Sequence, residues 1–257
     1  MKYIILVFIL VFELSAGVVV SSLVSIDEKN DIATIKVEKI DVGMSGYISH
    51  KVAPNHSVIL KNIEVISFDE QTKIAKLKMS KFNELNSDAL PSGRWSVEVG
   101  DEAILAFGYT RGLLIAPSEE IYHRITRSVK NLQWVHPDIF ATILSFNGHP
   151  TPLREDFTRL SIETSVGLIF IYLDEKLFTV DARSFKILTI TDAKLKQDST
   201  QLPFYTRVEE IDAAWWGEGS DELESYEPYY YEVLTKANPN NKALEEIVKN
   251  FKVKVSK

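Results

Sequence analysis

The sequence contains no cysteine at any of its 257 positions. Disulfide bonds, zinc sites built on thiolates and a cysteine nucleophile are therefore excluded. The same absence excludes the lipid-bearing cysteine of a bacterial lipoprotein. There are five histidines, and no two of them have the four-residue helical spacing that zinc metalloproteases use. The composition thus offers few of the groups on which hydrolytic or metal-dependent catalysis is usually built, and we expect a protein without a metal or other cofactor.

Basic side chains are scarcer than acidic ones, with 29 lysines and arginines against 36 aspartates and glutamates and a formal net charge of -7. A charge of this sign argues against general nucleic-acid binding. The deficit is concentrated between Arg207 and Leu234, where Arg207 is the single base among nine acids, so this stretch alone carries -8. The remainder of the chain is close to neutral.

Long apolar runs are also scarce, and the clearest one lies at residues 3–12. Lys2 precedes this run, and the small residues Ser15 and Ala16 follow it. A positive start, an apolar stretch of about ten residues and small residues at a cleavage position are typical of a secretory signal peptide, which we place at residues 1–16. A membrane anchor is the alternative, although Glu13 interrupts the apolar residues and a span needs about twenty. We expect an exported protein of the cell envelope or surface, or alternatively of the periplasm.

Residues 17–116 show short stretches of period-two alternation separated by turn residues, which predicts a β-rich module. The expected strands span 18–26, 32–37, 45–50, 57–66, 73–79 and 102–107. Several short antiparallel strands must close or stack to hide one face, so a small barrel or sandwich is expected.

Residues 117–193 change to helical spacing and predict an α/β module, which makes the whole chain α+β. Ser118 is expected to cap a first helix, and Pro137 and Gly148 to begin and end a second. The apolar run 166–173 predicts a centrally buried strand, with 177–181 as its hairpin partner.

Residues 194–257 are expected to form an irregular acidic arm rich in aromatic side chains, followed by a short basic end. A final short helix over 240–251 is predicted from its apolar stripe. Trp215, Trp216 and residues 229–231 admit two interpretations. They could anchor a basic partner, as hot-spot aromatics do, or the arm could pack over the barrel with its acids in water. We favour the second.

One histidine stands near an acid in a suggestive order, His136-Pro137-Asp138. The string lies where a strand gives way to a helix, so His136 is expected near the helix cap and Asp138 in the first turn. A hydrolase built on these two side chains is the enzymatic alternative, and we favour the structural interpretation. We therefore expect a protein that is not an enzyme and has no evident small-molecule substrate.

Several strings in this order resemble the N-terminal domain of the epsilonproteobacterial plasminogen-binding proteins. The resemblance covers residues 17–193, and it rests on Asp88-Ala89-Leu90-Pro91, residues 99–105, residues 114–117 with Tyr122, residues 135–141, residues 167–171 and residues 178–185. It implies an envelope or surface protein that captures host plasminogen through lysine and so contributes to host interaction and virulence.

The family's lysine feature carries over to Lys257. A terminal lysine combines an ammonium group with a free carboxylate, a ligand that suits the lysine-binding pockets of kringle domains, which offer acids, bases and an aromatic floor. Lys252 and Lys254 are the neighbouring candidate contacts. The alternative is a periplasmic structural or assembly factor that holds another envelope protein through the β-rich module or through Trp215 and Trp216.

Overall fold

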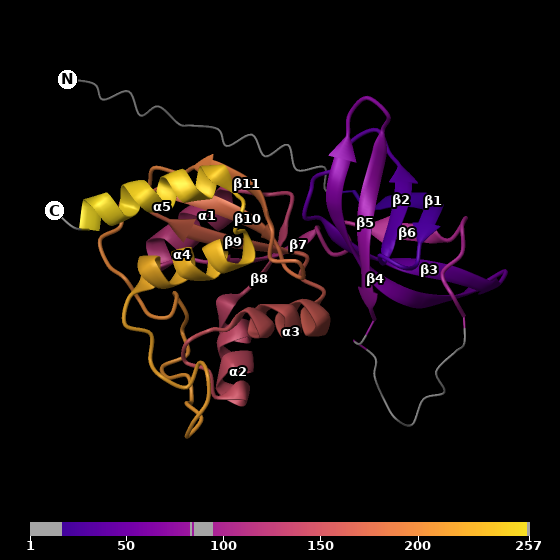
Figure 1. The fold of residues 1–257 in the computed structure, drawn as a ribbon. Coiled ribbons are helices and arrows are strands. Elements are labelled where there is room, and N and C mark those ends of the chain that lie inside the picture. The colour runs from indigo at the N-terminus through magenta and orange to yellow at the C-terminus, as the bar shows by residue number, and fades with distance from the viewer. Residues whose placement is uncertain (1–16, 83, 85–94, 256–257) are drawn as a thin grey trace.

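The computed structural model describes residues 17–82, 84 and 95–255, and the first module within these residues is a closed six-stranded barrel (Figure 1). Its strands lie in the order β1-β2-β5-β4-β3-β6, all antiparallel. The bounds are β1 (Val19–Asp27), β2 (Ile32–Lys36), β3 (Ser45–Ala53), β4 (His56–Asp69), β5 (Ile74–Lys81) and β6 (Glu102–Leu105). The prediction of a small barrel or sandwich is confirmed as a barrel, and closure leaves the sheet without free edges.

Strand β5 shows why this segment closes around a core. Ala75, Leu77 and Met79 point inward and are at most 4% exposed. Lys76 and Lys78 alternate with them and lie in solvent. This period-two alternation is the pattern that predicted the strands.

The second module contains a five-stranded mixed sheet in the order β11-β10-β9-β7-β8. Strand β7 pairs in parallel with β8 on one side and with β9 on the other, whereas β9, β10 and β11 form an antiparallel meander. The bounds are β7 (Arg111–Ile115), β8 (Gln133–Val135), β9 (Leu168–Leu173), β10 (Lys176–Asp181) and β11 (Ile187–Asp192). Every residue of β9 is buried, which confirms the predicted central strand. The sheet also includes β7, so it begins before residue 117.

Helices cover both faces of this sheet (Figure 1). Helix α1 (Glu119–Ser128) packs on the face that carries Leu114 and Phe170, and that core continues into the barrel. Helices α2 (Pro137–Asn147), α3 (Arg154–Thr164), α4 (Tyr226–Ala237) and α5 (Lys242–Val255) belong to the core of the opposite face, which carries Leu113 and Ile169.

The predicted helix ends are confirmed. The Ser118 hydroxyl accepts a hydrogen bond from the Ile121 amide at the start of α1. Pro137 is the first residue of α2, and Gly148 ends the helix with a left-handed φ of 72°. A Cβ at Gly148 would lie 2.6 Å from the backbone nitrogen of Ala214, so glycine is required both by conformation and by this close approach.

The expected irregular arm is found at residues 193–225, where the structure has neither helix nor strand. Two corrections apply beyond this. The arm does not pack over the barrel but against the second module. The Tyr205 amide donates to the Ala116 carbonyl, Asp212 bonds to Ser145 on α2, and the Ala214 amide donates to the carbonyl of Gly148 at the end of α2. Helix α4, which the sequence pattern did not predict, follows the irregular segment, because its tyrosines find an apolar sheet face to cover. The predicted final helix is confirmed as α5.

Asp181, at the end of β10, joins the two modules. Its carboxylate is fully buried and accepts hydrogen bonds from the Ser45 amide at 2.9 Å, from the Ser45 hydroxyl at 2.8 Å and from the Tyr109 hydroxyl at 2.8 Å. The amides of Arg183 and Ser184 bond to its other oxygen. A buried carboxylate with five donors is well compensated, so this group fixes the barrel against the α/β module.

None of the helices that the structure describes is both long enough and apolar enough to cross a membrane.

Candidate partner-binding surfaces

Helix α5 places the candidate lysines on its outer side. Leu244 is 1% exposed, and Phe251 packs with its ring 5.0 Å from that of Tyr231 on α4. These apolar contacts turn the opposite side of α5 toward solvent, where Lys249 and Lys252 are both exposed. The two lysines are three residues apart, so they are neighbours on the helix surface.

Lys252 is therefore exposed, as its role as a contact requires. The backbone of Lys254 lies in the last turn of α5, and Lys257 falls outside the described residues. Neither Lys249 nor Lys252 forms an ion pair with any acid among the residues that the structure describes. The sequence reasoning missed Lys249, although its spacing from Lys252 within the predicted helix was a usable signal.

The barrel presents a second set of lysines. Lys36, Lys51, Lys76 and Lys81 are exposed on β2, β3 and β5. They lie in a different module from α5, and they therefore offer a matched comparison for any lysine-dependent binding.

His136 and Asp138 act in the cap of α2. The Nδ1 atom of His136 lies 3.2 Å from the Asp138 amide and 3.1 Å from the Asp138 carboxylate, and burial lowers the pKa of His136. The Asp138 carboxylate receives the Thr206 hydroxyl at 2.9 Å and the Arg207 side chain at 2.6 Å. The predicted place of both residues at the helix start is confirmed, and the Asp138 side chain holds the arm.

Trp215 and Trp216 lie in the irregular segment between β11 and α4, the orange loops beside α2 on the side away from the barrel in Figure 1. Their side chains are 103% and 85% exposed. The burial of these aromatic side chains, which the favoured interpretation of a packed arm implies, is thus not found for the tryptophans. It is confirmed for Tyr230 and Tyr231, which are 0% and 3% exposed.

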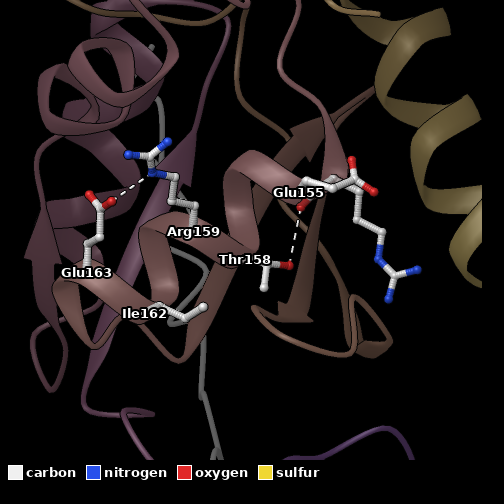
Figure 2. Close-up of a pocket in the computed structure, with 6 residues that line it drawn as sticks. Glu155, Thr158, Arg159, Ile162 and Glu163 are labelled. Atoms are coloured by element: carbon white, nitrogen blue, oxygen red, sulfur yellow. Dashed lines mark hydrogen bonds and ion pairs between the residues drawn. The ribbon is translucent and has the colours of Figure 1, made fainter. Parts of the chain in front are cut away.

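The outer face of α3 carries a shallow hollow of about 360 Å³, shown in Figure 2. Arg159 donates from Nε to Glu163 at 2.7 Å there, and its guanidinium also lies 5.0 Å from the Phe146 ring. Because these charges are engaged with one another, the hollow does not concentrate charge of one sign for a ligand.

A cavity of about 230 Å³ lies where the two modules meet, beside Ser45 and Ser184. Arg183 forms a 2.6 Å ion pair with Glu84 in its wall, and burial raises the pKa of Glu64. Its polar lining belongs to the same junction as Asp181. In the described part of the chain, no cluster of three or more histidine, aspartate or glutamate side chains could hold a metal ion.

Comparison with known proteins identifies relatives. A family model described as the N-terminal region of plasminogen-binding protein pgbA matches residues 18–234, which include the barrel and most of the second module. Two curated proteins, each named Plasminogen-binding protein PgbA, come from Helicobacter pylori strains J99 and 26695. Each is 26% identical over 214 residues, or 82% of this chain and 46% of the relative.

The chain thus spans about half the length of these curated relatives. No solved structure matches it.

Proposed function

Because this chain belongs to the family of the N-terminal region of plasminogen-binding protein PgbA, we propose that it binds plasminogen through lysine side chains on its surface. The observation that carries the proposal is the family match over residues 18–234 together with the names of the two relatives. Those relatives are named as binding proteins, in keeping with a function that is not enzymatic.

Two groups of lysines are candidates for the contact with plasminogen. Lys249, Lys252, Lys254 and Lys257 lie in or beyond α5, after the part of the chain that the family model matches. Lys36, Lys51, Lys76 and Lys81 lie on the barrel, within the matched part. We propose the α5 group, with Lys257 as its main contact, for kringle domains of plasminogen. Its support is the unpaired exposure of Lys249 and Lys252 on one helix face.

The test removes four positive charges from α5 and its continuation in one variant, and four from the barrel in another. One variant carries K249A, K252A, K254A and K257A, and its matched control carries K36A, K51A, K76A and K81A. Binding to immobilised plasminogen is measured for both, with 6-aminohexanoate as a competing lysine analogue. We expect the α5 variant to lose at least tenfold in affinity, about 1.4 kcal/mol, while the barrel variant binds as the parent does.

The outcomes separate the parts of the proposal. Deletion of Lys257 alone should lower the affinity for plasminogen if this residue is the main contact, and unchanged affinity would reject that role. Loss in the barrel variant alone would transfer the site to the barrel. Binding that persists in both variants and in the competitor would reject recognition through lysine.

We also propose that the protein is exported and reaches the cell surface, which the apolar residues 3–12 support. Protease treatment of intact cells tests this, because a surface protein is digested and a periplasmic one is protected. Protection would favour the second candidate, a periplasmic factor that holds an envelope protein.

A further inference from the structure

The most exposed large apolar side chains in the described chain form a pair. Trp215 and Trp216 are adjacent and 103% and 85% exposed, and Phe146 at the end of α2 is 78% exposed. Burying one large apolar side chain is worth about 1.5 to 3 kcal/mol. Two neighbouring indoles left in water are therefore a surface that gains from being covered.

The loop that carries the indoles is held on both sides by the connection between α2 and α3. Before the indoles, the Ala214 amide donates to the Gly148 carbonyl at 2.9 Å. Beyond them, the Thr151 amide donates to the Gly219 carbonyl at 3.1 Å, and the Thr151 hydroxyl donates to the Asp221 carbonyl at 2.7 Å. Because the backbone is fixed before a partner arrives, less conformational entropy is lost on binding.

Ser145 strengthens the first of these two attachments. Its hydroxyl donates to the Asp212 carboxylate at 2.7 Å and accepts from the Asp212 amide at 2.9 Å. The indoles thus stand on a loop that is tied down before and after them, and their exposure is a property of a held conformation.

An acidic hollow lies in the same segment. It has a volume of about 250 Å³, and Glu209, Glu210 and Glu222 line it together with the apolar side chains of Val208, Ile211 and Leu223. None of the three glutamates pairs with a base among the described residues. Residues 208–225 contain seven acids and no base.

This combination selects the occupant. A metal ion is disfavoured, because the carboxylates that the structure describes do not converge on a common point. An anionic membrane is repelled by seven acids. Lysine and arginine carry an apolar stem and a terminal cation, so a segment with several of them offers apolar stems to the indoles and cations to the glutamates of the hollow.

We propose that residues 208–225 form a docking site for a lysine- or arginine-rich segment of a partner protein, with Trp215 and Trp216 as apolar anchors and Glu209, Glu210 and Glu222 as the charge-binding groups. The site shares no residue with the lysines proposed to bind plasminogen, and its charge has the opposite sign.

The experiment uses the whole chain and fluorescently labelled hexaarginine and hexalysine, with hexaglutamate as the negative probe, followed by anisotropy. We expect both basic peptides to bind and the acidic one not to bind. Binding should weaken with added salt, because exposed charges are screened. W215A/W216A should lower the affinity at least tenfold, and circular dichroism should show an unchanged fold because both indoles are in solvent.

A matched pair of variants distinguishes binding by the glutamates of the hollow from attraction by the net negative charge of the protein. E209Q/E210Q/E222Q should lower the affinity at least tenfold, whereas E28Q/E38Q/E70Q, which removes three exposed barrel glutamates, should change it less than twofold. Equal losses in the two triple variants would show attraction by net charge alone and overturn the proposal. So would unchanged binding by W215A/W216A.

Two other occupants are tested in parallel. Binding to phosphatidylcholine or phosphatidylglycerol vesicles, without peptide binding, would replace the proposal with a membrane contact. Self-association in analytical ultracentrifugation that W215A/W216A abolishes, without peptide binding, would replace it with a second copy of the chain.

Discussion

Trp215 and Trp216 lie in the same acidic segment as Tyr230 and Tyr231, and yet the two pairs have opposite surroundings. The indoles are 103% and 85% exposed, whereas the two tyrosines are 0% and 3% exposed. Composition is similar around both pairs, so composition did not decide the difference. The backbone conformation decided it. Helix α4 turns its tyrosines toward the core of the sheet, whereas the irregular loop does not direct its tryptophans toward any core.

Helix α4 shows how the tyrosines are buried. Tyr226, Tyr230 and Leu234 follow one another at four-residue spacing, and all three face the sheet core. The Tyr226 hydroxyl donates to the Ile115 carbonyl at 3.1 Å, and the Tyr230 hydroxyl donates to the Pro203 carbonyl at 2.9 Å. These two hydroxyls are thereby compensated, because an unpaired hydroxyl in the core is costly.

The largest expected effect comes from removing one of these tyrosines. Tyr230→Ala should destabilise the protein by about 3 to 5 kcal/mol, the range for a large buried aromatic side chain. Trp215→Ala and Trp216→Ala should each stay within about 0.5 kcal/mol, because both side chains are in water. Urea unfolding followed by circular dichroism measures all three. A loss for either tryptophan variant comparable with that of Tyr230→Ala would break the comparison.

A smaller effect is expected within the irregular segment, where Asp138 receives the side chain and amide of Arg207. Burial would raise the pKa of Asp138, but the hydrogen bonds from Arg207 and Thr206 outweigh it and lower the pKa to about 2. The folded-state pKa is depressed, so the stabilisation is present above the unfolded value near 3.9 and is lost as the pH falls toward 2.

Asp138→Asn should therefore cost about 1.5 to 3 kcal/mol at neutral pH, the range for hydrogen bonds to a charged group. The difference from the parent should shrink between about pH 4 and pH 2. Urea midpoints across this pH range measure it, and Glu28→Gln in the barrel is the control, since its side chain is exposed and lies in the other module. A difference that stays constant down to pH 2 would show that the carboxylate charge does not hold the arm.

Local signals in the sequence predicted much of the fold. The period-two alternation of apolar residues predicted the barrel strands, and Pro137 and Gly148 predicted the ends of α2. The apolar stripe of the last helix implied an outer side, and Lys252 is exposed there. Helix α4 was missed for a local reason as well. Pro228 lies in its first turn, where proline is tolerated, but it interrupts the pattern that predicts a helix.

Other features depend on partners far away in the chain, which a sequence pattern does not specify. Ser45 meets Asp181 across 136 residues, and Arg207 meets Asp138 across 69. The exposure of Trp215 and Trp216 follows from the same kind of contact, because residues 145–151 hold the loop around them. Whether an aromatic pair is an anchor or a core element therefore could not be decided from residue types.

The smallest expected effect concerns that hold on the tryptophan loop. Thr151→Val removes the hydroxyl that donates to the Asp221 carbonyl and keeps the size of the side chain. The cost should be about 0.5 to 1 kcal/mol, typical of one neutral hydrogen bond, and it should be accompanied by faster amide hydrogen exchange at residues 214–221. Thr158→Val on α3, which loses a 3.4 Å bond to the Arg154 carbonyl (Figure 2), is the control and should leave that exchange unchanged. Unchanged exchange in Thr151→Val would mean that the remaining contacts of the loop, made by Asp212, Ala214 and Gly219, are enough to hold the indoles in solvent. The contrast with the buried tyrosines would then depend on those three residues.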